Sequence, residues 1–168
     1  DYDRKQDTSL TVEASRNFAN KLWNATRFAL INLGSQSFES FGEINFATLQ
    51  LTDRWILSRL TRVNRDSAKR YETYGLGEVA KGLYEFAWND FCDWYLELIK
   101  RRLNPGEKSI EAALVDQTIA RQVLLKVLSE YLVLLNPLMP HLTEELWHAL
   151  TGEPEETLLA LQPWPELD

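Results

Sequence analysis

The residues best suited to chemistry lie along one predicted helix, which spans residues 15–33. At 100° per residue, this segment separates into an apolar side and a polar side. The polar side carries three cations and four asparagines, has two aromatic residues at its edges, and contains no carboxylate. Cations suit phosphates, amides suit base edges and aromatic rings suit stacking, so the mixture fits single-stranded RNA. The candidate RNA contacts are Arg16, Asn17, Asn20, Lys21, Trp23, Asn24, Arg27 and Phe28, and Asn32 is the fourth asparagine.

The same polar side can also be interpreted as the solvated face of an ordinary amphipathic helix. Solvated faces normally mix charges of both signs, and asparagine is a mediocre helix former, so the composition favours a ligand. The pattern alone leaves both interpretations open. The opposite side predicts a core stripe of Phe18, Leu22, Ala25, Ala29 and Leu33.

The composition restricts the class of protein. The chain has 168 residues, 45% hydrophobic and 26% charged, as in an ordinary globular domain. Its net charge of −7 excludes a generally basic nucleic-acid binder, so any nucleic-acid contact must be a local patch.

A single cysteine, Cys92, excludes an internal disulfide and indicates a reducing compartment. No apolar run is long enough to span a membrane. The first residue is Asp rather than Met, which suggests a piece of a longer protein.

Helix signals predict an all-α fold, an antiparallel bundle of four long helices with a short C-terminal helix and an extended tail. The first helix is expected to start between residues 8 and 11 and to run to Leu33, with Gly34 just past its end and a long loop over 34–50. The second is expected to begin with Thr52 as its N-cap and to end near Gly75. The others are predicted at about 78–103, 109–135 (capped by Ser109) and 142–150, with Gly152 after the last. This divides the chain into a lead-in (1–7), a helical bundle (8–152) and an extended C-terminal segment (153–168).

The predicted third helix is rich in aromatic residues and ends in three cations. Helical spacing places its core side along Val79, Leu83, Phe86, Asp90, Trp94 and Leu98. The run Trp88, Phe91, Trp94 and Tyr95 favours core over a stacking platform, because Asp90 and Asp93 alongside would repel phosphate. Lys100, Arg101 and Arg102 fall in the last turn, where cations complement the helix dipole, and this placement favours that role over the alternative of RNA binding.

No residue pattern predicts a catalytic residue or a metal ligand. Glu145 and His148 fit the Glu-x-x-His pattern of metal-binding bundles, but those sites need two copies and this chain has one. His141 is expected to cap a helix instead. Cys92 is expected to be a structural thiol, since no His is near in sequence and Asp93 would raise its pKa. The sequence also lacks a glycine-rich phosphate loop and a nucleophile signature.

Five stretches, taken in order, cover nearly the whole chain: RNFANKLWNATRF (16–28), LTDRWILSRL (51–60), YEFAWNDFCDWYLELIK (84–100), LLNPLMPHLTEELW (134–147) and QPWP (162–165). Together they resemble the helical anticodon-binding domain of class I valyl-tRNA synthetases. Each later stretch alone would also suit the isoleucyl, leucyl and methionyl enzymes. The segments 20–24 and 53–57 favour the valyl branch.

The resemblance implies a module that binds the anticodon stem-loop of tRNA(Val) in a cytoplasmic enzyme. That enzyme would join valine to its tRNA through a valyl-adenylate, using ATP and magnesium. Its His-Ile-Gly-His and Lys-Met-Ser-Lys-Ser signatures do not occur here, so residues 1–7 would follow an upstream catalytic domain. No catalytic residue, metal or cofactor is expected in this chain, and neither a membrane nor DNA is expected as a partner.

In that family the first helix of the domain approaches the anticodon. The resemblance therefore implies that Arg16, Lys21 and Arg27 contact phosphates or base edges of the anticodon loop. It implies that Asn17, Asn20 and Asn24 read bases or tie the helix to its neighbours, and that Trp23 or Phe28 stacks on an unstacked base. Two alternatives stay open: a helical scaffold that docks a protein partner through this face, and a metal-dependent bundle enzyme built on Glu145 and His148.

Overall fold

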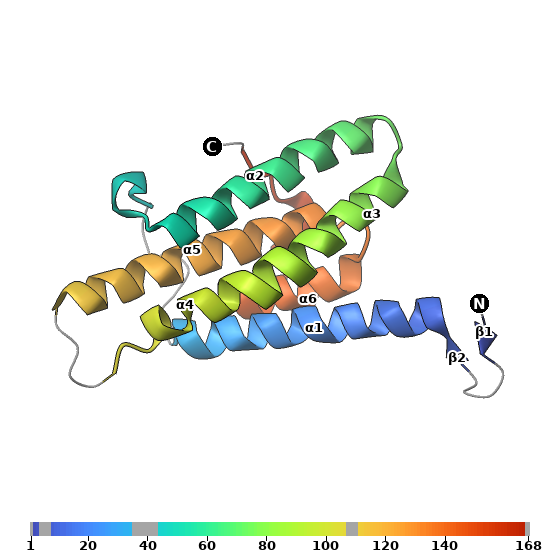
Figure 1. The fold of residues 1–168 in the computed structure, drawn as a ribbon. Helices are drawn as coiled ribbons and strands as arrows, with labels where there is room; N and C mark the ends of the chain where they lie inside the picture. Colours follow the sequence, from blue (N-terminus) through green and yellow to red (C-terminus); the bar gives the residue numbers. More distant parts are fainter. Residues whose placement is uncertain (1, 4–7, 35–43, 107–110, 167–168) are drawn as a thin grey trace.

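The structure is a computed structural model that describes residues 2–3, 8–34, 44–106 and 111–166. Its elements are β1 (Tyr2–Asp3), β2 (Thr8–Ser9), α1 (Leu10–Leu33), η2 (Phe46–Thr48), α2 (Leu51–Glu72), α3 (Leu76–Glu85), η3 (Phe86–Tyr95), α4 (Leu96–Leu103), α5 (Glu111–Leu135), α6 (Pro140–Thr151) and η4 (Leu159–Leu161). α3, η3 and α4 follow one another without a break and form the third long helix. The predicted all-α bundle of four long helices and a short C-terminal helix is confirmed (Figure 1). A two-residue antiparallel pairing of β1 with β2 precedes α1.

The central element of the bundle is α5. Apolar residues occur on all its sides, and such a helix is stable only when it is buried. It packs against α1, α2, α3, α4 and α6, and Figure 1 shows it between α1 and α2, which lie on opposite sides of the bundle. Each surrounding helix therefore needs only one apolar stripe, and its other side faces outward. The buried residues of α5 are Ala120, Val123, Leu124, Leu125, Val127, Leu128, Ser129, Tyr131, Leu132, Leu134 and Leu135.

The first and third long helices run side by side in the same direction. Lys21 Nζ lies 2.6 Å from Asp93 Oδ1, and Asn104 Nδ2 donates to Asn32 Oδ1 over 2.9 Å. Both pairs join residues 72 positions apart, so the two helices stay in step along this stretch.

The middle of the third helix, η3, is π-helical over ten residues. Each of its i→i+5 hydrogen bonds spans one residue more than the i→i+4 bonds of an α-helix, so each turn holds more residues. The buried side therefore passes from Phe86 to Phe91 and Tyr95, each at most 3% exposed, instead of through Asp90. This change of period rotates the following residues about the helix axis.

The rotation contradicts part of the predicted core. Trp94 and Leu98 were expected to follow the buried stripe, but their exposed fractions are 62% and 48%. The aromatic run is core at Phe91 and Tyr95, half-buried at Trp88, and exposed at Trp94. A sequence pattern read with the α-helical period cannot detect this shift.

Most predicted helix ends agree with the structure. Gly34 and Gly152 follow α1 and α6 with φ values of +70° and +72°, the left-handed conformation that ends helices. The predicted N-cap of α2 was wrong, because Gln50 rather than Thr52 occupies it; the Gln50 N–H donates to Asp53 Oδ2 over 3.1 Å. The expected cap Ser109 and most of the 34–50 loop lie outside the described residues.

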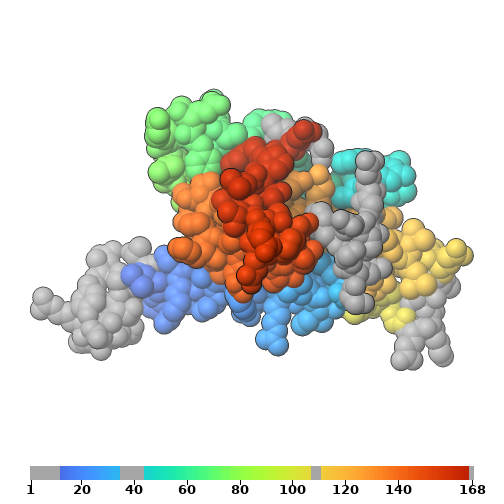
Figure 2. Space-filling model, turned by 180° about the vertical axis from the view of Figure 1, so that it is seen from behind, coloured from blue at the N-terminus to red at the C-terminus, as the bar shows by residue number. Residues whose placement is uncertain are grey.

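The C-terminal segment crosses the bundle from α6 to α2, on the face that Figure 2 shows. The N–H of Leu159, a buried residue, donates to Glu144 Oε1 over 2.7 Å. Farther along, Trp164 Nε1 donates to Asn64 Oδ1 over 2.6 Å, and Asn64 Nδ2 donates to the carbonyl of Pro165 over 2.9 Å. Asn64 thus fixes Trp164 and Pro165, near the end of the described chain, to α2.

Candidate functional site

The predicted RNA contacts depend on how α1 is oriented in the bundle. All five residues of its predicted core stripe are buried, which confirms that stripe. Because α1 packs on α5, α6 and η3 through this side, its other side faces outward. Six of the eight predicted contacts are exposed there, and we call them the α1 strip: Arg16, Asn17, Asn20, Trp23, Asn24 and Arg27.

The α1 strip is a line of donors with one aromatic ring. Arg16, Asn20, Trp23 and Arg27 follow each other at i, i+4, i+7 and i+11, which places them on one side of the helix. At 1.5 Å per residue the line is about 17 Å long. The Trp23 side chain is 48% exposed, so much of its ring is accessible. This geometry offers charge, hydrogen bonds and a stacking surface to a single extended ligand.

The two arginines of the strip are little neutralised within the protein. Arg16 forms an ion pair with Glu13 at 3.6 Å, and both side chains are well exposed, so water and salt weaken the pair. Arg27 is exposed and has no ion-pair or hydrogen-bond partner among the described residues. Arg27 is therefore the cation of α1 best placed for an external anion.

Lys21 lies apart from the strip, at the contact between α1 and η3. Its Nζ pairs with Asp93 at 2.6 Å and lies 3.8 Å from the centre of the Trp88 ring. A cation over an indole ring is held by the ring's electrons as well as by the carboxylate. The structure therefore gives Lys21 contacts that join two helices.

The other end of α1 is also tied to its neighbours. Phe28 is half-buried and packs against the core. Asn32, which the pattern placed on the polar side, is only 8% exposed. Its amide donates to the Phe28 carbonyl over 2.8 Å and its oxygen accepts from Asn104. Asn32 is thus a structural link between α1 and the end of α4.

Cys92 lies half-buried on η3, close to Lys21. Burial raises the pKa of its thiol to about 11; Lys21 acts in the opposite direction and Asp93 adds to the rise. The thiol is therefore protonated near neutral pH, which agrees with the predicted structural role.

At pH 7, iodoacetamide should alkylate Cys92 about two orders of magnitude more slowly in the folded chain than in urea. The reason is that the thiolate, the reactive form, is much scarcer at a pKa of about 11 than at the ordinary value of about 8.5. Mass spectrometry of timed samples measures both rates, and the folded rate should rise up to about pH 11. Equal rates at pH 7 would contradict this prediction.

The histidines do not follow the metal-site pattern. His148 Nε2 lies 3.4 Å from Glu144 Oε1, and its Nδ1 lies 3.0 Å from the carbonyl of Glu153, whereas Glu145 is exposed. Within the described ranges, no three His, Cys, Asp or Glu side chains gather as metal ligands would. The predicted helix cap by His141 was wrong, because Met139 is the N-cap of α6.

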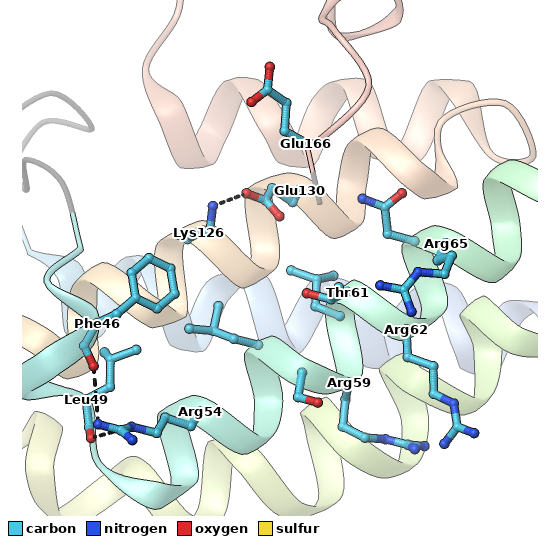
Figure 3. Close-up of a pocket in the computed structure, with 14 residues that line it drawn as sticks. Phe46, Leu49, Arg54, Arg59, Thr61, Arg62, Arg65, Lys126, Glu130 and Glu166 are labelled. Carbon is cyan, nitrogen blue, oxygen red and sulfur yellow. Dashed lines mark hydrogen bonds and ion pairs between the residues drawn. The ribbon is translucent and has the colours of Figure 1, made fainter. Parts of the chain in front are cut away.

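A second polar region, absent from the sequence-based prediction, lies between α2 and α5. It is a groove of about 640 Å³, and we call it the α2 groove (Figure 3). Arginines from successive turns of α2 line it, with Lys126 and Glu130 of α5 opposite. The spacing of arginines at 59, 62 and 65 was a signal available in the sequence. Its lining arginines are Arg54, Arg59, Arg62 and Arg65.

Comparison with known proteins identifies the family. Residues 53–168 match the family described as the anticodon-binding domain of tRNA ligase. The chain belongs to this anticodon-binding family. The match begins in the first turn of α2, so α1 precedes the part of the chain that defines the family.

Individual proteins that are similar to this chain align with it over nearly its whole length, including α1. A valine–tRNA ligase of Parasynechococcus marenigrum is 71% identical over 167 residues, which are 99% of this chain and 18% of that protein. Valine–tRNA ligases of Prochlorococcus marinus and Synechocystis sp. are 70% and 52% identical over 98% and 99% of this chain. The predicted resemblance to the anticodon-binding part of valyl-tRNA synthetases is confirmed. The chain spans about 18% of the length of these relatives.

None of the described helices is long and apolar enough to cross a bilayer.

Proposed function

We propose that this chain binds the anticodon stem-loop of tRNA(Val) as part of a valyl-tRNA synthetase. The observation that carries the proposal is the α1 strip, an exposed line of arginines, asparagines and one tryptophan on a chain whose net charge is −7. The similarity to valine–tRNA ligases along the whole chain supports the choice of RNA.

Each residue type in the strip has a distinct role in this proposal. Arg16 and Arg27, at the two ends, contact phosphates or base edges, and Asn20 and Asn24 between them bond to bases. The exposed ring of Trp23 stacks on an unpaired base, an interaction of about 1–3 kcal/mol. Lys21, bound to Asp93 and Trp88, acts mainly by fixing α1 against η3.

The rest of the enzyme would supply the chemistry. We propose that a catalytic domain upstream of residues 1–7 forms the valyl-adenylate from valine and ATP with magnesium, and that the enzyme is cytoplasmic. In this proposal residues 8–152 form the anticodon-binding bundle, and residues 153–168 form an extended segment along its surface.

Replacing Arg27 with alanine should weaken binding of the tRNA(Val) anticodon hairpin by about fivefold or more, or about 1 kcal/mol. Fluorescence anisotropy of the labelled hairpin at low salt measures this change. Wild-type chain should prefer the valine anticodon over a hairpin with a scrambled loop, and the variant should lose that preference.

Lys81→Ala is the matched control, because Lys81 is an exposed cation on α3 and does not belong to the α1 strip. It should bind both hairpins like the wild type. Equal wild-type affinity for the two loops, or no effect of Arg27→Ala, would contradict the proposal and favour a protein partner for this face.

A further inference from the structure

Positive charge is concentrated on α2, although the chain as a whole is acidic. This helix holds six of the 18 Lys and Arg residues of the chain: Arg54, Arg59, Arg62, Arg65, Lys69 and Arg70. Of its three acidic residues, Asp53 is fully buried and bound to Arg102, so Asp66 and Glu72 alone remain exposed on α2. The outer side of α2 is therefore basic.

The α2 groove gives this charge a shape. Four arginines and Lys126 line it, against two carboxylates, Glu130 and Glu166. Lys126 and Glu130 pair with each other at 2.7 Å. Arg54, Ser58, Thr61 and Arg65 occur at i, i+4, i+7 and i+11, so two hydroxyls lie between two guanidinium groups on one side of the helix.

Two of the arginines are held in place by the protein. Arg54 donates to the carbonyls of Leu49 and Phe46 over 3.2 and 3.3 Å, and these neutral partners leave its charge uncompensated (Figure 3). Arg59 Nε lies 2.7 Å from Asp90 Oδ2, which fixes its direction but neutralises it. Fixed guanidinium groups lose less side-chain freedom when they bind a ligand.

Arg62 and Arg65 differ from these two. Both are exposed, and neither has an ion-pair or hydrogen-bond partner within the described part of the chain. Together with Arg54 they give the lining of the groove three guanidinium groups that no described carboxylate pairs with. Figure 3 shows that the Arg62 side chain points away from Glu166, toward the outer edge of the groove, where Asp66, Glu85 and Asp90 also lie. Guanidinium forks and hydroxyl donors are the groups that bind phosphate oxygens.

We propose that the α2 groove is a second RNA-binding surface, which binds the phosphodiester backbone of an RNA helix without regard to base sequence. The choice of RNA as the polyanion rests on the proposed function. Figure 1 shows α1 and α2 on opposite sides of the bundle, with α5 between them. The groove therefore binds a different stretch of RNA from the one at the α1 strip.

The test uses the whole 168-residue chain and a short, fully paired RNA duplex that has no loop. Its binding is measured by fluorescence anisotropy between about 50 and 200 mM salt. The double variant Arg62→Ala with Arg65→Ala should bind about tenfold more weakly, and the slope of log K against log salt should fall by about 2. Arg62→Lys with Arg65→Lys, which keeps both charges, should retain most of that slope.

Lys81→Ala with Arg101→Ala is the charge-matched control, since it removes two exposed cations on the third helix. It should leave duplex binding unchanged, and circular dichroism should show all variants folded. Equal losses in the double variant and this control would overturn the proposal. Equally tight binding of polyglutamate would also overturn it, by indicating an acidic protein as the partner.

The outcomes separate this inference from the proposed function. Arg27→Ala should leave duplex binding unchanged, because Arg27 lies on α1. If the wild-type chain shows no preference for the valine anticodon loop while the double variant still loses duplex binding, the proposal for the α1 strip is contradicted and the proposal for the α2 groove is supported. If loop preference is present and the double variant binds the duplex normally, only the groove proposal fails.

Discussion

Replacing Arg102 with alanine should lower the free energy of unfolding by about 3–5 kcal/mol. Arg102 donates to both carboxylate oxygens of Asp53 over 2.7 and 2.9 Å, and to Asp116 over 2.8 Å. Burial acts to lower the pKa of Arg102, but its hydrogen bonds to Asp53 and Asp116 outweigh that effect and raise it. Alanine would leave the fully buried Asp53 carboxylate without its counter-charge.

Urea unfolding followed by circular dichroism measures this loss. Arg101→Ala is the matched control, because the neighbouring Arg101 is exposed, and it should change stability by about 0.5 kcal/mol or less. The neutral pair Asp53→Asn with Arg102→Met should lose less than Arg102→Ala alone, since it leaves no buried charge. A loss below about 1 kcal/mol for Arg102→Ala would contradict the role assigned to this ion pair.

Replacing Phe91 with alanine should cost about 3–5 kcal/mol of stability, whereas replacing Trp94 should cost about 0.5 kcal/mol or less. Phe91 is 1% exposed and Trp94 is 62% exposed, although both are aromatic residues on η3. The difference follows from the π-helical period, because a continuous α-helix would bury Trp94 along with Phe86. Thermal and urea unfolding of the two variants measure it.

The next turn provides a control for this prediction. Ile99→Ala should be strongly destabilising and Leu98→Ala nearly neutral, since Ile99 is buried and Leu98 is 48% exposed. A larger loss for Trp94 and Leu98 than for Phe91 and Ile99 would show that the third helix is α-helical throughout.

Local patterns predicted the parts of the fold that depend on neighbouring residues. The stripe from Phe18 to Leu33 followed from the helical period, and the ends of α1 and α6 followed from the glycines at 34 and 152. The stripe also predicted which side of α1 faces outward, because a helix that buries one side exposes the opposite side. Six of the eight candidate contacts could be placed on the surface in this way.

Contacts between distant residues could not be predicted. Lys21 and Asn32 belong to the polar side by pattern, but Asp93 and Asn104, each 72 residues away, bind them. The helix dipole alone was a sufficient reason for a cation at position 102. Its partner Asp53 is 49 residues away, so no local pattern predicted their ion pair. The α2 groove requires α5 and the C-terminal segment as walls, so the arginines alone do not reveal it.

The parallel course of α1 and the third helix has an electrostatic consequence. The Asn32–Asn104 bond brings the carbonyl ends of α1 and α4 together, so two partial negative charges lie side by side and repel each other. The last turn of α1 contains no basic residue, whereas that of α4 contains Lys100, Arg101 and Arg102. Cations at a helix end contribute about 0.3–1 kcal/mol each. Arg102 is already paired with Asp53 and Asp116, and Lys100 with Glu97. Within the described residues, Arg101 is therefore the cation of this turn that is left to compensate the macrodipoles of both helices.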